Sequence, residues 1–531
     1  MLSFGVIIVQ FYGYRRLRVP SYKLARTKLN YFREWLWPVK SHEFATFFPL
    51  FYIKFAASFI YCILFSIKET VIITAAGSGA EAIPVLKGGV VLTAAFLMML
   101  AYSKLSNILD MRRLFYVILT PFLVFFLIYG WYIFPNRELL ALHSSADKLA
   151  TWLGSGHSHW VSVYRYWMNS LFFVLSELWG GIAIGVLFWS FANTVTDIKA
   201  AAKFYPLYTA GGHIGTICAG LLGFLITGYS SNYFSYDFNI KILMSLVFAL
   251  GLSIFIAFYF VSSTHAPKLH KINLTKAKTQ LSLIESLRYI MRSPYIGLIA
   301  VIVISYGLSV NMIEVAWKAL LKMKYPNPAE YQQFLSMLLT ILGVVSTIVA
   351  VGVGGGFIRR FGWYLSAQLT PLVLGITSLL FFIVYFMCPD LNSTDTIIFS
   401  MTPLSLMVVI GTLHNVACKS MKYSMFDPTK EMAYIPLSQE EKIKGKACVD
   451  LLGARFGKSG SSFLQLFLID ILGAGSILTV VPLLVPCVAI VVGIWAFAVH
   501  LLNLKISVLG KAKIESSNLD EKLVGNVPVA N

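Results

Sequence analysis

Long apolar stretches recur along the whole chain, each bounded by a short polar or basic segment. A membrane-spanning helix needs about 20 mostly apolar residues. Backbone groups inside a bilayer must find their hydrogen bonds within the segment, which favours helices. The pattern predicts an all-α polytopic membrane protein with about twelve transmembrane helices, at 45–66, 82–102, 114–134, 162–192, 204–228, 240–262, 295–318, 332–354, 364–387, 402–425, 449–470 and 478–503.

Composition supports a membrane body. The 531 residues are 57% hydrophobic and 13% charged, whereas about a quarter of the residues of a soluble protein are charged. The six cysteines are far apart and form no CxxC pair, so we expect neither a disulfide framework nor a metal site. No cofactor motif is present, and the lipid bilayer is the expected surrounding.

Basic residues set the expected orientation. The formal net charge is +19, and Lys and Arg gather in cytoplasmic loops of membrane proteins. The segment between spans six and seven is basic, as are the loops after spans two and eight. We therefore expect both termini to be cytoplasmic, with a basic N-terminal segment at 1–44, six-helix halves at 45–262 and 295–503, a cytoplasmic linker at 263–294 and a tail at 504–531.

The two halves have matching features. Short basic loops follow spans two and eight, and spans five and eleven both begin with polar, glycine-rich sequence, at 211–215 and 453–460. Such parallel repeats are typical of major-facilitator-like transporters. We predict that architecture.

Span seven carries charges inside the membrane. Asn311, Glu314, Lys318 and Lys322 fall within about 80° of one another on an α-helix. Glu314 precedes Lys318 by four residues, the favourable order for an ion pair. The pair could simply neutralise itself, but a scaffold helix could use apolar residues without the desolvation cost. We interpret the stripe as functional.

Spans ten and eleven add more cations. Asn415, Lys419 and Lys422 form a stripe in span ten, which either lines a pathway or extends its ammonium groups to the interface. Span eleven holds Arg455 and Lys458 beside a run of Ser and Gly. Helix packing alone would explain the small residues but not the two cations.

Acidic residues accompany these cations. Glu177 lies deep in the apolar fourth span, where a carboxylate must pair, bind a cation or be protonated. Lys87 opens span two, either as a functional cation or as an interfacial anchor, and Lys68 and Glu69 end span one.

Together, these residues give both halves cations near the bundle axis. Each close charge pair contributes about 4 kcal/mol at an effective dielectric near 20, before desolvation. Several Lys and Arg therefore suit a polyanionic substrate, and the acids would keep an empty site from trapping it.

Other classes fit less well. The stretch 453–459 resembles a phosphate-binding loop but has three residues between its glycines, where the motif needs four. We therefore exclude an ATPase engine. No catalytic grouping indicates an enzyme, and no nucleic-acid partner is expected. His157 and His159 fall in an expected external loop, where we expect them to be solvated.

Several runs resemble one transporter family, over about residues 45–500. They are 77–87, 177–180, 188–193, 203–207, 419–437, 444–446 and 457–460. The chain resembles the ATP/ADP translocase (nucleotide transporter) family of plastids and obligate intracellular bacteria. The resemblance implies that Lys87, Glu177, Glu314 and Lys458 are important for transport.

The resemblance has departures. Family members that exchange ATP for ADP usually carry Leu-Arg-Asp-x-Lys-Asp at the end of span one, where this chain has residues 64–69, LFSIKE. His213 stands where Asn is common in the family. The family includes ATP/ADP exchangers, proton symporters of nucleoside triphosphates and a carrier of NAD, so the altered motif puts plain ATP/ADP exchange in question.

These observations predict a secondary active transporter in the cell inner membrane that moves nucleotides by exchange or proton symport. The alternative is a major-facilitator-like carrier of another organic anion, such as a sugar phosphate or NAD. The expected phosphate-binding residues are Lys87 and Lys458, with Lys68, Lys318, Lys422 and Arg455 as weaker candidates. The expected coupling or gating acids are Glu177 and Glu314.

Overall fold

The structure is a computed structural model. It describes residues 39–524 except 197, 231–232, 265–292, 351–354, 392, 394–399, 438–440, 442–444, 446–448, 450–452 and 472–474. Most of the predicted N-terminal segment (1–44) and of the linker (263–294) therefore lies outside the described residues, as does the end of the tail.

Eleven helical segments of the described chain are long and apolar enough to cross a membrane. They are Ser41–Ile73, Ala82–Ile108, Met111–Ile133, Trp167–Val195, Lys203–Tyr229, Tyr236–Thr264, Pro294–Lys324, Pro328–Val349, Phe357–Met387, Pro403–Ala433 and Val481–Val508. Helix α21 (Ala454–Ile471) stands where the eleventh predicted span was expected. It is less apolar because it carries Arg455, Lys458 and Asp470.

Helix starts in the second half have strong sequence signals. Helices α15 (Pro294–Lys324), α16 (Pro328–Val349) and α18 (Pro403–Met421) each begin with Pro in the first turn. The preceding Ser293, Asn327 and Thr402 each accept a backbone N–H bond from the first turn. A capping side chain followed by Pro satisfies or removes N–H groups that a helix leaves unpaired.

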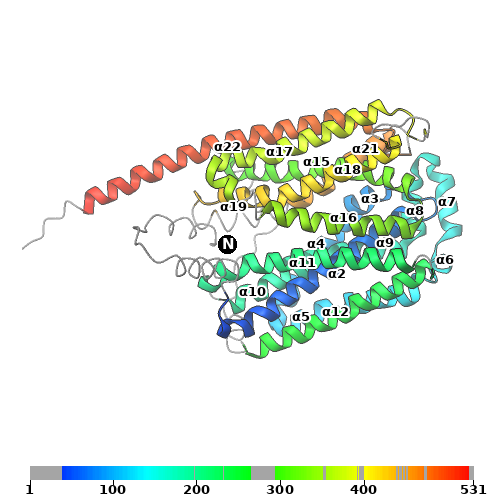
Figure 1. Ribbon diagram of the computed structural model, residues 1–531, viewed down its shortest axis with the longest axis horizontal. Helices are drawn as coiled ribbons and strands as arrows, with labels where there is room; N and C mark the ends of the chain where they lie inside the picture. Colours follow the sequence, from blue (N-terminus) through cyan, green and yellow to red (C-terminus); the bar gives the residue numbers. More distant parts are fainter. Residues whose placement is uncertain are drawn as a thin grey trace, which may run out of the picture.

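The two halves pack by the same rules. In the first half α2 (Phe44–Ile73) lies against α11 (Ile198–Ser230) and α12 (Tyr236–Thr264). In the second half α15 makes the equivalent contacts with α21 and α22 (Val481–Val524). Between the halves, α11 packs on α16, and α21 packs on the start of span two (Figure 1). Spans one, five and six thus correspond to spans seven, eleven and twelve, as the predicted duplication requires.

In the part of the chain that the structure describes, four spans contain π-helical segments of at least five residues. These are η3 (Leu86–Val90), η4 (Tyr129–Ile133), η6 (Gly180–Phe188) and η8 (Lys422–Phe426). Segments η6 and η8 lie in spans four and ten, which are equivalent positions of the two halves. Such segments are rare and often mark functional sites. Here η3 contains Lys87, η6 begins three residues after Glu177, and η8 begins three residues after Lys419.

Several predicted element ends differ from the structure. Helix α2 runs on to Ile73 instead of ending near residue 66, so Lys68 and Glu69 lie within the helix. Helix α22 continues from Val481 to Val524, beyond the predicted end at 503. Between spans three and four, α6 (Arg137–Leu140), α7 (His143–Leu153) and α8 (Ser158–Arg165) replace the expected loop.

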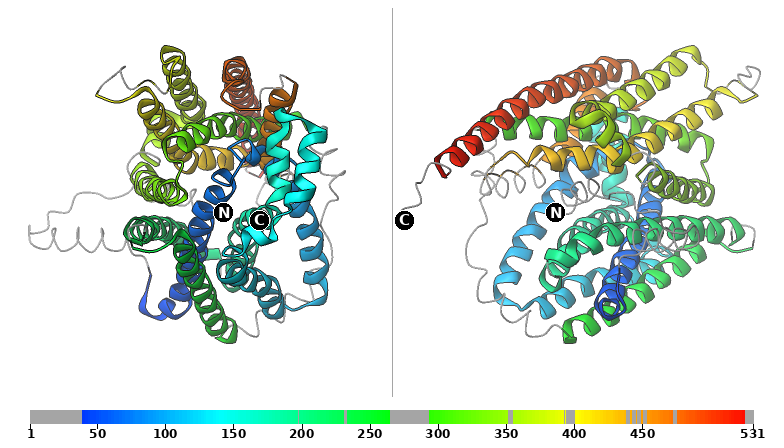
Figure 2. Two further views of the ribbon diagram at one scale, coloured as in Figure 1. Left: turned by 90° about the vertical axis from the view of Figure 1, so that its right-hand side faces the viewer. Right: turned by 60° about the vertical axis from the view of Figure 1, so that its left-hand side comes forward.

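Helices α2 and α15 form the centre of the bundle. Their most apolar windows are 72% and 67% buried by protein, more than those of the other spans. Figure 2 shows α2 running through the middle of the molecule. Helices α6 to α8 cap one end of the bundle, and the far end of α22 projects from the opposite end (Figure 1). We call these the capped end and the terminal end.

Candidate functional site

A buried ion pair joins the two halves at the bundle axis. Lys318 of α15 lies 3.0 Å from Glu69 of α2, and both side chains are fully buried. Each also has a partner within its own half. Lys318 lies 3.1 Å from Glu314, and Glu69 lies 2.9 Å from Lys68. The Glu314–Lys318 pair confirms the geometry expected from their spacing.

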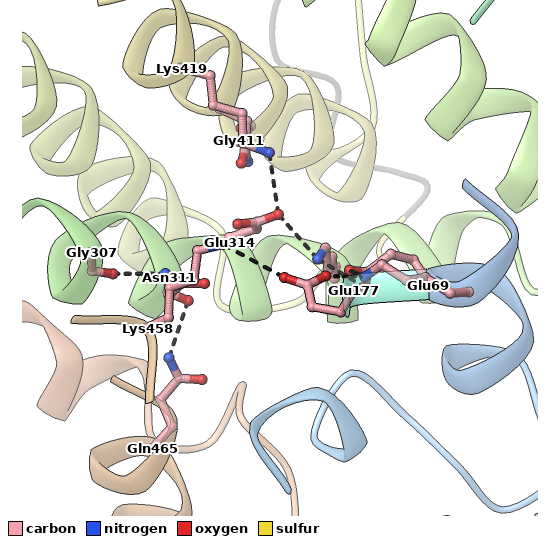
Figure 3. Close-up of polar contacts among 12 residues, drawn as sticks. Glu69, Glu177, Gly307, Asn311, Glu314, Gly411, Lys419, Lys458 and Gln465 are labelled. Atoms are coloured by element: carbon pink, nitrogen blue, oxygen red, sulfur yellow. Dashed lines mark hydrogen bonds and ion pairs between the residues drawn. The ribbon is translucent and has the colours of Figure 1, made fainter. Parts of the chain in front are cut away.

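The network continues into spans four and ten. In the first half, Lys68 lies 3.1 Å from Glu177 of α9 (Trp167–Trp179). In the second half, Glu314 lies 3.3 Å from Lys419 of α18 (Figure 3). Spans one and four therefore form the pair Lys68–Glu177, and the equivalent spans seven and ten form Glu314–Lys419 with the charges exchanged. The two-fold packing places a cation and an acid at equivalent points on each side of the axis.

A third helix of the second half reaches the network through Lys458. Its Nζ lies 3.6 Å from Glu177. Tight packing positions α21. Gly457 of α21 lies directly against Gly307 of α15, and a Cβ added to either glycine would come within 3.0 Å of the Cα of the other. Gln465 of α21 also donates a hydrogen bond to the carbonyl of Asn311, one turn before Glu314 (Figure 3). A larger residue at either glycine would push α21 and Lys458 away.

Exposure increases from the middle of the network toward its ends. The side chains of Lys68, Glu69 and Lys318 are 0% exposed, and that of Glu314 is 8% exposed. Glu177 is 15% exposed, Lys419 22% and Lys458 55%. Lys458 is thus the cation of the network most open to a ligand, and its 3.6 Å pair with Glu177 is the longest in the network.

Lys87 lies beside this network without a described ion pair or hydrogen bond from its side chain. It is buried at the start of η3 and interacts electrostatically with Glu69, Glu177 and Glu314. Ser459 of α21 donates a hydrogen bond to its carbonyl oxygen, which ties η3 to the second half. A buried ammonium without a close carboxylate is a natural place for an anion.

Aromatic rings line the buried part. The Nζ of Lys68 lies 3.9 Å from the ring centroid of Phe173. The ring of Phe65 lies 5.0 Å from the Nζ of Lys68 and 5.7 Å from those of Lys318 and Lys419. Phe65 stands at the position of the Arg in the Leu-Arg-Asp-x-Lys-Asp motif. An aromatic ring, in place of another cation, therefore faces the three lysines.

Other predicted residues lie at the margin. Lys422 pairs with Asp427 at 2.7 Å. Arg455 is exposed at the beginning of α21. Lys322 donates a hydrogen bond to the carbonyl of Ser78 near the capped end. The structure therefore brings Lys68, Lys87, Glu177, Glu314, Lys318 and Lys458 together, whereas the ion pair of Lys422 is with Asp427.

Two residues of the network were not among the predicted site residues. Glu69 appeared to end span one, and Lys419 was equally compatible with an interfacial position. The signal for Lys419 was its place on a stripe with Asn415, whose amide donates to the Gly411 carbonyl on the buried side of α18. Neither sequence pattern revealed that Glu69 would pair with Lys318 of the other half.

The expectation that His157 and His159 are solvated was wrong for His159. Its side chain is 1% exposed and lies 3.2 Å from Asp470 at the end of α21. His157 is a third exposed and lies 3.8 Å from the same carboxylate. The expected loop instead folds into α8, which packs beside the start of span two and buries the imidazole of His159 between the halves.

A second acid strengthens this contact. Glu81 accepts hydrogen bonds from the Ile477 backbone N–H and the Ser476 hydroxyl, at 2.8 and 3.0 Å. Glu81 belongs to the first half, and Ser476 and Ile477 to the second. The polar contacts around Glu81 and His159 therefore join the halves at the capped end.

The arrangement has clear chemical consequences. Five lysines and three glutamates surround one buried region: Lys68, Lys87, Lys318, Lys419, Lys458, Glu69, Glu177 and Glu314. The three carboxylates neutralise part of the positive charge of the five lysines, and the excess positive charge can attract an anion. No nucleophile with an activating base faces this region among the described residues.

The sequence profile of the TLC ATP/ADP transporter family matches residues 23–506. The chain belongs to this family. It is 38% identical to ADP,ATP carrier protein 1 of Chlamydia pneumoniae, over 89% of this chain and 93% of that protein. It is 37% identical to the chloroplastic ADP,ATP carrier protein 1 of Arabidopsis thaliana, over 85% of this chain and 72% of that protein.

Further comparisons agree with this family and with the fold. ADP,ATP carrier protein 3 of Rickettsia felis is 32% identical over 89% of this chain and 96% of that protein. A bacterial homologue of the iron transporter ferroportin, in an inward-facing state, has a TM-score of 0.52 at 12% identity, covering 88% of this chain and 98% of that one. A peptide-bound POT family transporter has a TM-score of 0.51 at 12% identity, covering 86% and 96%. The TLC-family chain is thus a multi-pass carrier with a major-facilitator-like fold, and not an enzyme.

Proposed function

We propose that this carrier moves nucleotides across the inner membrane, by exchange of ATP and ADP or by co-transport of nucleoside triphosphates with protons. Its termini and the 263–294 linker would be cytoplasmic, which makes the terminal end the cytoplasmic end. The observation that supports this most directly is the network of five lysines and three glutamates shared by both halves.

Lys458 and Lys87 are the proposed phosphate-binding residues. Lys458 is half exposed and held by a single pair of 3.6 Å, so a phosphate can compete with Glu177 for it. Lys87 is buried near the acids but has no described ion pair. Lys68 and Lys318 have two carboxylates each, so they would contribute mainly through their electrostatic attraction for the substrate. Arg455 and Lys422 are the weaker candidates.

Glu177 and Glu314 are the proposed switching acids. Glu177 is shared by Lys68 and Lys458, and Glu314 by Lys318 and Lys419. When phosphate takes Lys458, Glu177 retains Lys68 as its partner. In a proton-coupled cycle, the same carboxylate would accept a proton as the lysine leaves.

Alternating access would follow from the position of the contacts between the halves. Glu81, His159 and Asp470 join the halves at the capped end. The substrate site would then communicate with the terminal end in this arrangement. Rocking of one half against the other would break these contacts and open the opposite side.

Uptake of labelled nucleotides into bacterial cells that express the protein tests this function. Competition by the four ribonucleoside triphosphates, ADP, NAD and a sugar phosphate identifies the substrate class. Strong inhibition by the sugar phosphate alone would favour the alternative anion carrier. Uptake that collapses with a protonophore supports proton symport, and uptake that persists and is stimulated by internal nucleotide supports exchange.

Two variants test the phosphate assignment within the same assay. Lys87→Ala and Lys458→Ala should both transport much more slowly than the unmodified protein at equal amounts in the membrane. Wild-type rates for both variants would show that the phosphates bind elsewhere.

A further inference from the structure

A second buried lysine lies on α2, outside the network. Lys54 is only 8% exposed. Among the described residues, its ammonium group has no ion pair or hydrogen bond. Its neighbours are two aromatic rings of span four. The Nζ lies 5.2 Å from the ring centroid of Phe188 and 5.3 Å from that of Trp189.

Lys54 and Lys68 lie on one stripe of α2. Residues 54, 61 and 68 are seven positions apart, so they fall within about 40° on the helix surface. All three contact span four. Lys54 faces the two rings, the Tyr61 ring lies 2.7 Å from the Cβ position of Gly180, and Lys68 pairs with Glu177. Lys54 is fourteen residues before Lys68, so it lies about 21 Å from Lys68 along the helix axis, toward the terminal end.

The two lysines differ in what neutralises them. Lys68 has Glu69 and Glu177 as partners, whereas Lys54 faces only rings in the described structure. A cation–π contact offsets part of the desolvation cost of a buried ammonium group, but less than a carboxylate does. A methionine would fill the same space without that cost. The position therefore carries an uncompensated charge, which an anion would neutralise.

The surroundings of Lys54 place it beside the contact between the halves. Gly212 of α11 allows its close approach, since the Lys54 Cε lies 3.3 Å from the Cβ position of Gly212. The next residue, His213, packs its ring 5.5 Å from that of Tyr423 in the second half. Lys54 thus packs against the residue of α11 that directly precedes His213, which contacts the second half.

We propose that Lys54 is a second phosphate-binding subsite, which holds a phosphate group of the substrate between the central network and the terminal end. The rings of Phe188 and Trp189 form the apolar wall of this subsite and hold the ammonium group in place when no anion is bound. This subsite rests on the proposed function for the identity of its ligand. Its affinity for a phosphate chain can be measured without transport.

The test uses the purified full-length protein in detergent and inorganic tripolyphosphate as the probe. Tripolyphosphate should raise the melting midpoint of the unmodified protein in a saturable way. In Lys54→Met the half-saturating concentration should rise about tenfold, equivalent to one lost charge contact. Lys54→Arg should stay close to the unmodified protein. Without ligand, Lys54→Met should melt at the same or a higher temperature, because a buried uncompensated charge is gone.

A matched control comes from Lys241. Its Nζ lies 5.7 Å from the ring of Trp131 on the outer helices of the first half, so Lys241→Met also removes a cation–π lysine. That variant should bind tripolyphosphate as the unmodified protein does. In nucleotide uptake, Lys54→Met should raise KM more than it lowers kcat, and Lys241→Met should change neither.

The outcomes separate this subsite from the proposed function. Equal half-saturating concentrations in Lys54→Met and the unmodified protein overturn the subsite, whatever nucleotide uptake shows. A lower melting midpoint with unchanged tripolyphosphate binding also overturns it and makes Lys54 a structural residue. If Lys54→Met does not fold, Lys54→Gln replaces it and is judged by the same comparison. A Lys54-dependent tripolyphosphate shift in a protein that transports no nucleotide keeps the subsite and rejects the function.

Discussion

Lys318 of α15 and Glu69 of α2 form a 3.0 Å ion pair across the interface between the two halves, and neither side chain reaches solvent. Each has a second partner on its own side, Glu314 for Lys318 and Lys68 for Glu69. When the halves separate, neither charge is left alone. The pair can therefore break and re-form during a transport cycle without the full penalty of a stranded buried charge.

Removing Glu69 should destabilise the protein strongly. Glu69→Gln takes one carboxylate from both Lys68 and Lys318, and breaking a buried pair typically costs about 3–5 kcal/mol. The double variant Glu69→Gln/Lys318→Met should lose less than the sum of the two single variants, because it leaves fewer unpaired charges. Melting midpoints of the purified proteins measure both effects.

The exposed ion pair between Arg113 and Asp110 serves as the control for this experiment. Arg113→Gln should change the melting midpoint little, since exposed pairs contribute little to stability. Additive losses from Glu69→Gln and Lys318→Met would contradict a direct coupling between the two residues.

Lys458 should act on substrate affinity rather than on folding. It is the most exposed cation of the network and has one pair at 3.6 Å. Lys458→Gln should raise KM for the nucleotide about tenfold, the effect of losing roughly 1.4 kcal/mol of binding. Lys458→Arg should recover part of the affinity, and the melting midpoints of both should stay near that of the unmodified protein.

Lys505 provides a matched control for Lys458, because it is an exposed lysine near the middle of α22. Lys505→Gln should leave KM unchanged. An unaltered KM in Lys458→Gln would remove this residue from the substrate site.

Much of the fold followed from local sequence patterns. Apolar stretches predicted the spans, and the i, i+4 spacing predicted the Glu314–Lys318 pair, because both signals lie within one helix. The need of Glu177 for a partner was also evident from its apolar surroundings. Which cation would satisfy it was not, since Lys68 and Lys458 come from spans one and eleven and meet only in the folded bundle.

Glu69 and His159 show why other parts could not be predicted. The polar residues Lys68 and Glu69 looked like the end of a span because hydropathy falls there, yet α2 continues to Ile73 and buries both. His159 looked like a loop residue because its segment is polar. Its burial depends on α21 of the other half, which brings Asp470 against it, and no local pattern reports such a contact.

Acidification should weaken the contacts at the capped end. Burial lowers the pKa of His159 below its usual value, and Asp470 and Glu81 offset this in part, while His157 adds to it. The neutral imidazole is therefore favoured when the halves are joined there. As the pH falls below the usual His pKa of about 6.5, an opened arrangement binds the proton more readily, and the joined arrangement loses stability.

The measurement is the difference in melting midpoint between the unmodified protein and His159→Gln at several pH values. From about pH 7.5 to 5.5, the unmodified protein should lose stability relative to the variant. A relative gain would mean that attraction between the imidazolium and Asp470 outweighs burial. A constant difference would mean that His159 does not titrate in this range.

Locking the capped end should stop transport. A Cβ at Gly475 would lie 3.8 Å from the Cα of Gly156 in the other half, a separation compatible with a disulfide. In a background without the native cysteines, Gly156→Cys/Gly475→Cys should form a cross-link on oxidation. Nucleotide uptake should then fall to near zero and recover with a reductant, because alternating access requires the halves to separate at this end.

The single variants Gly156→Cys and Gly475→Cys are the controls, and oxidation should leave their uptake unchanged. Gly475 has a φ of 63°, so cysteine there costs about 1–3 kcal/mol, and protein amounts must be matched before rates are compared. If the cross-linked double variant transports as fast as the same variant after treatment with a reductant, this contact does not open during transport. The substrate would then have to pass between the halves by a movement other than the proposed rocking.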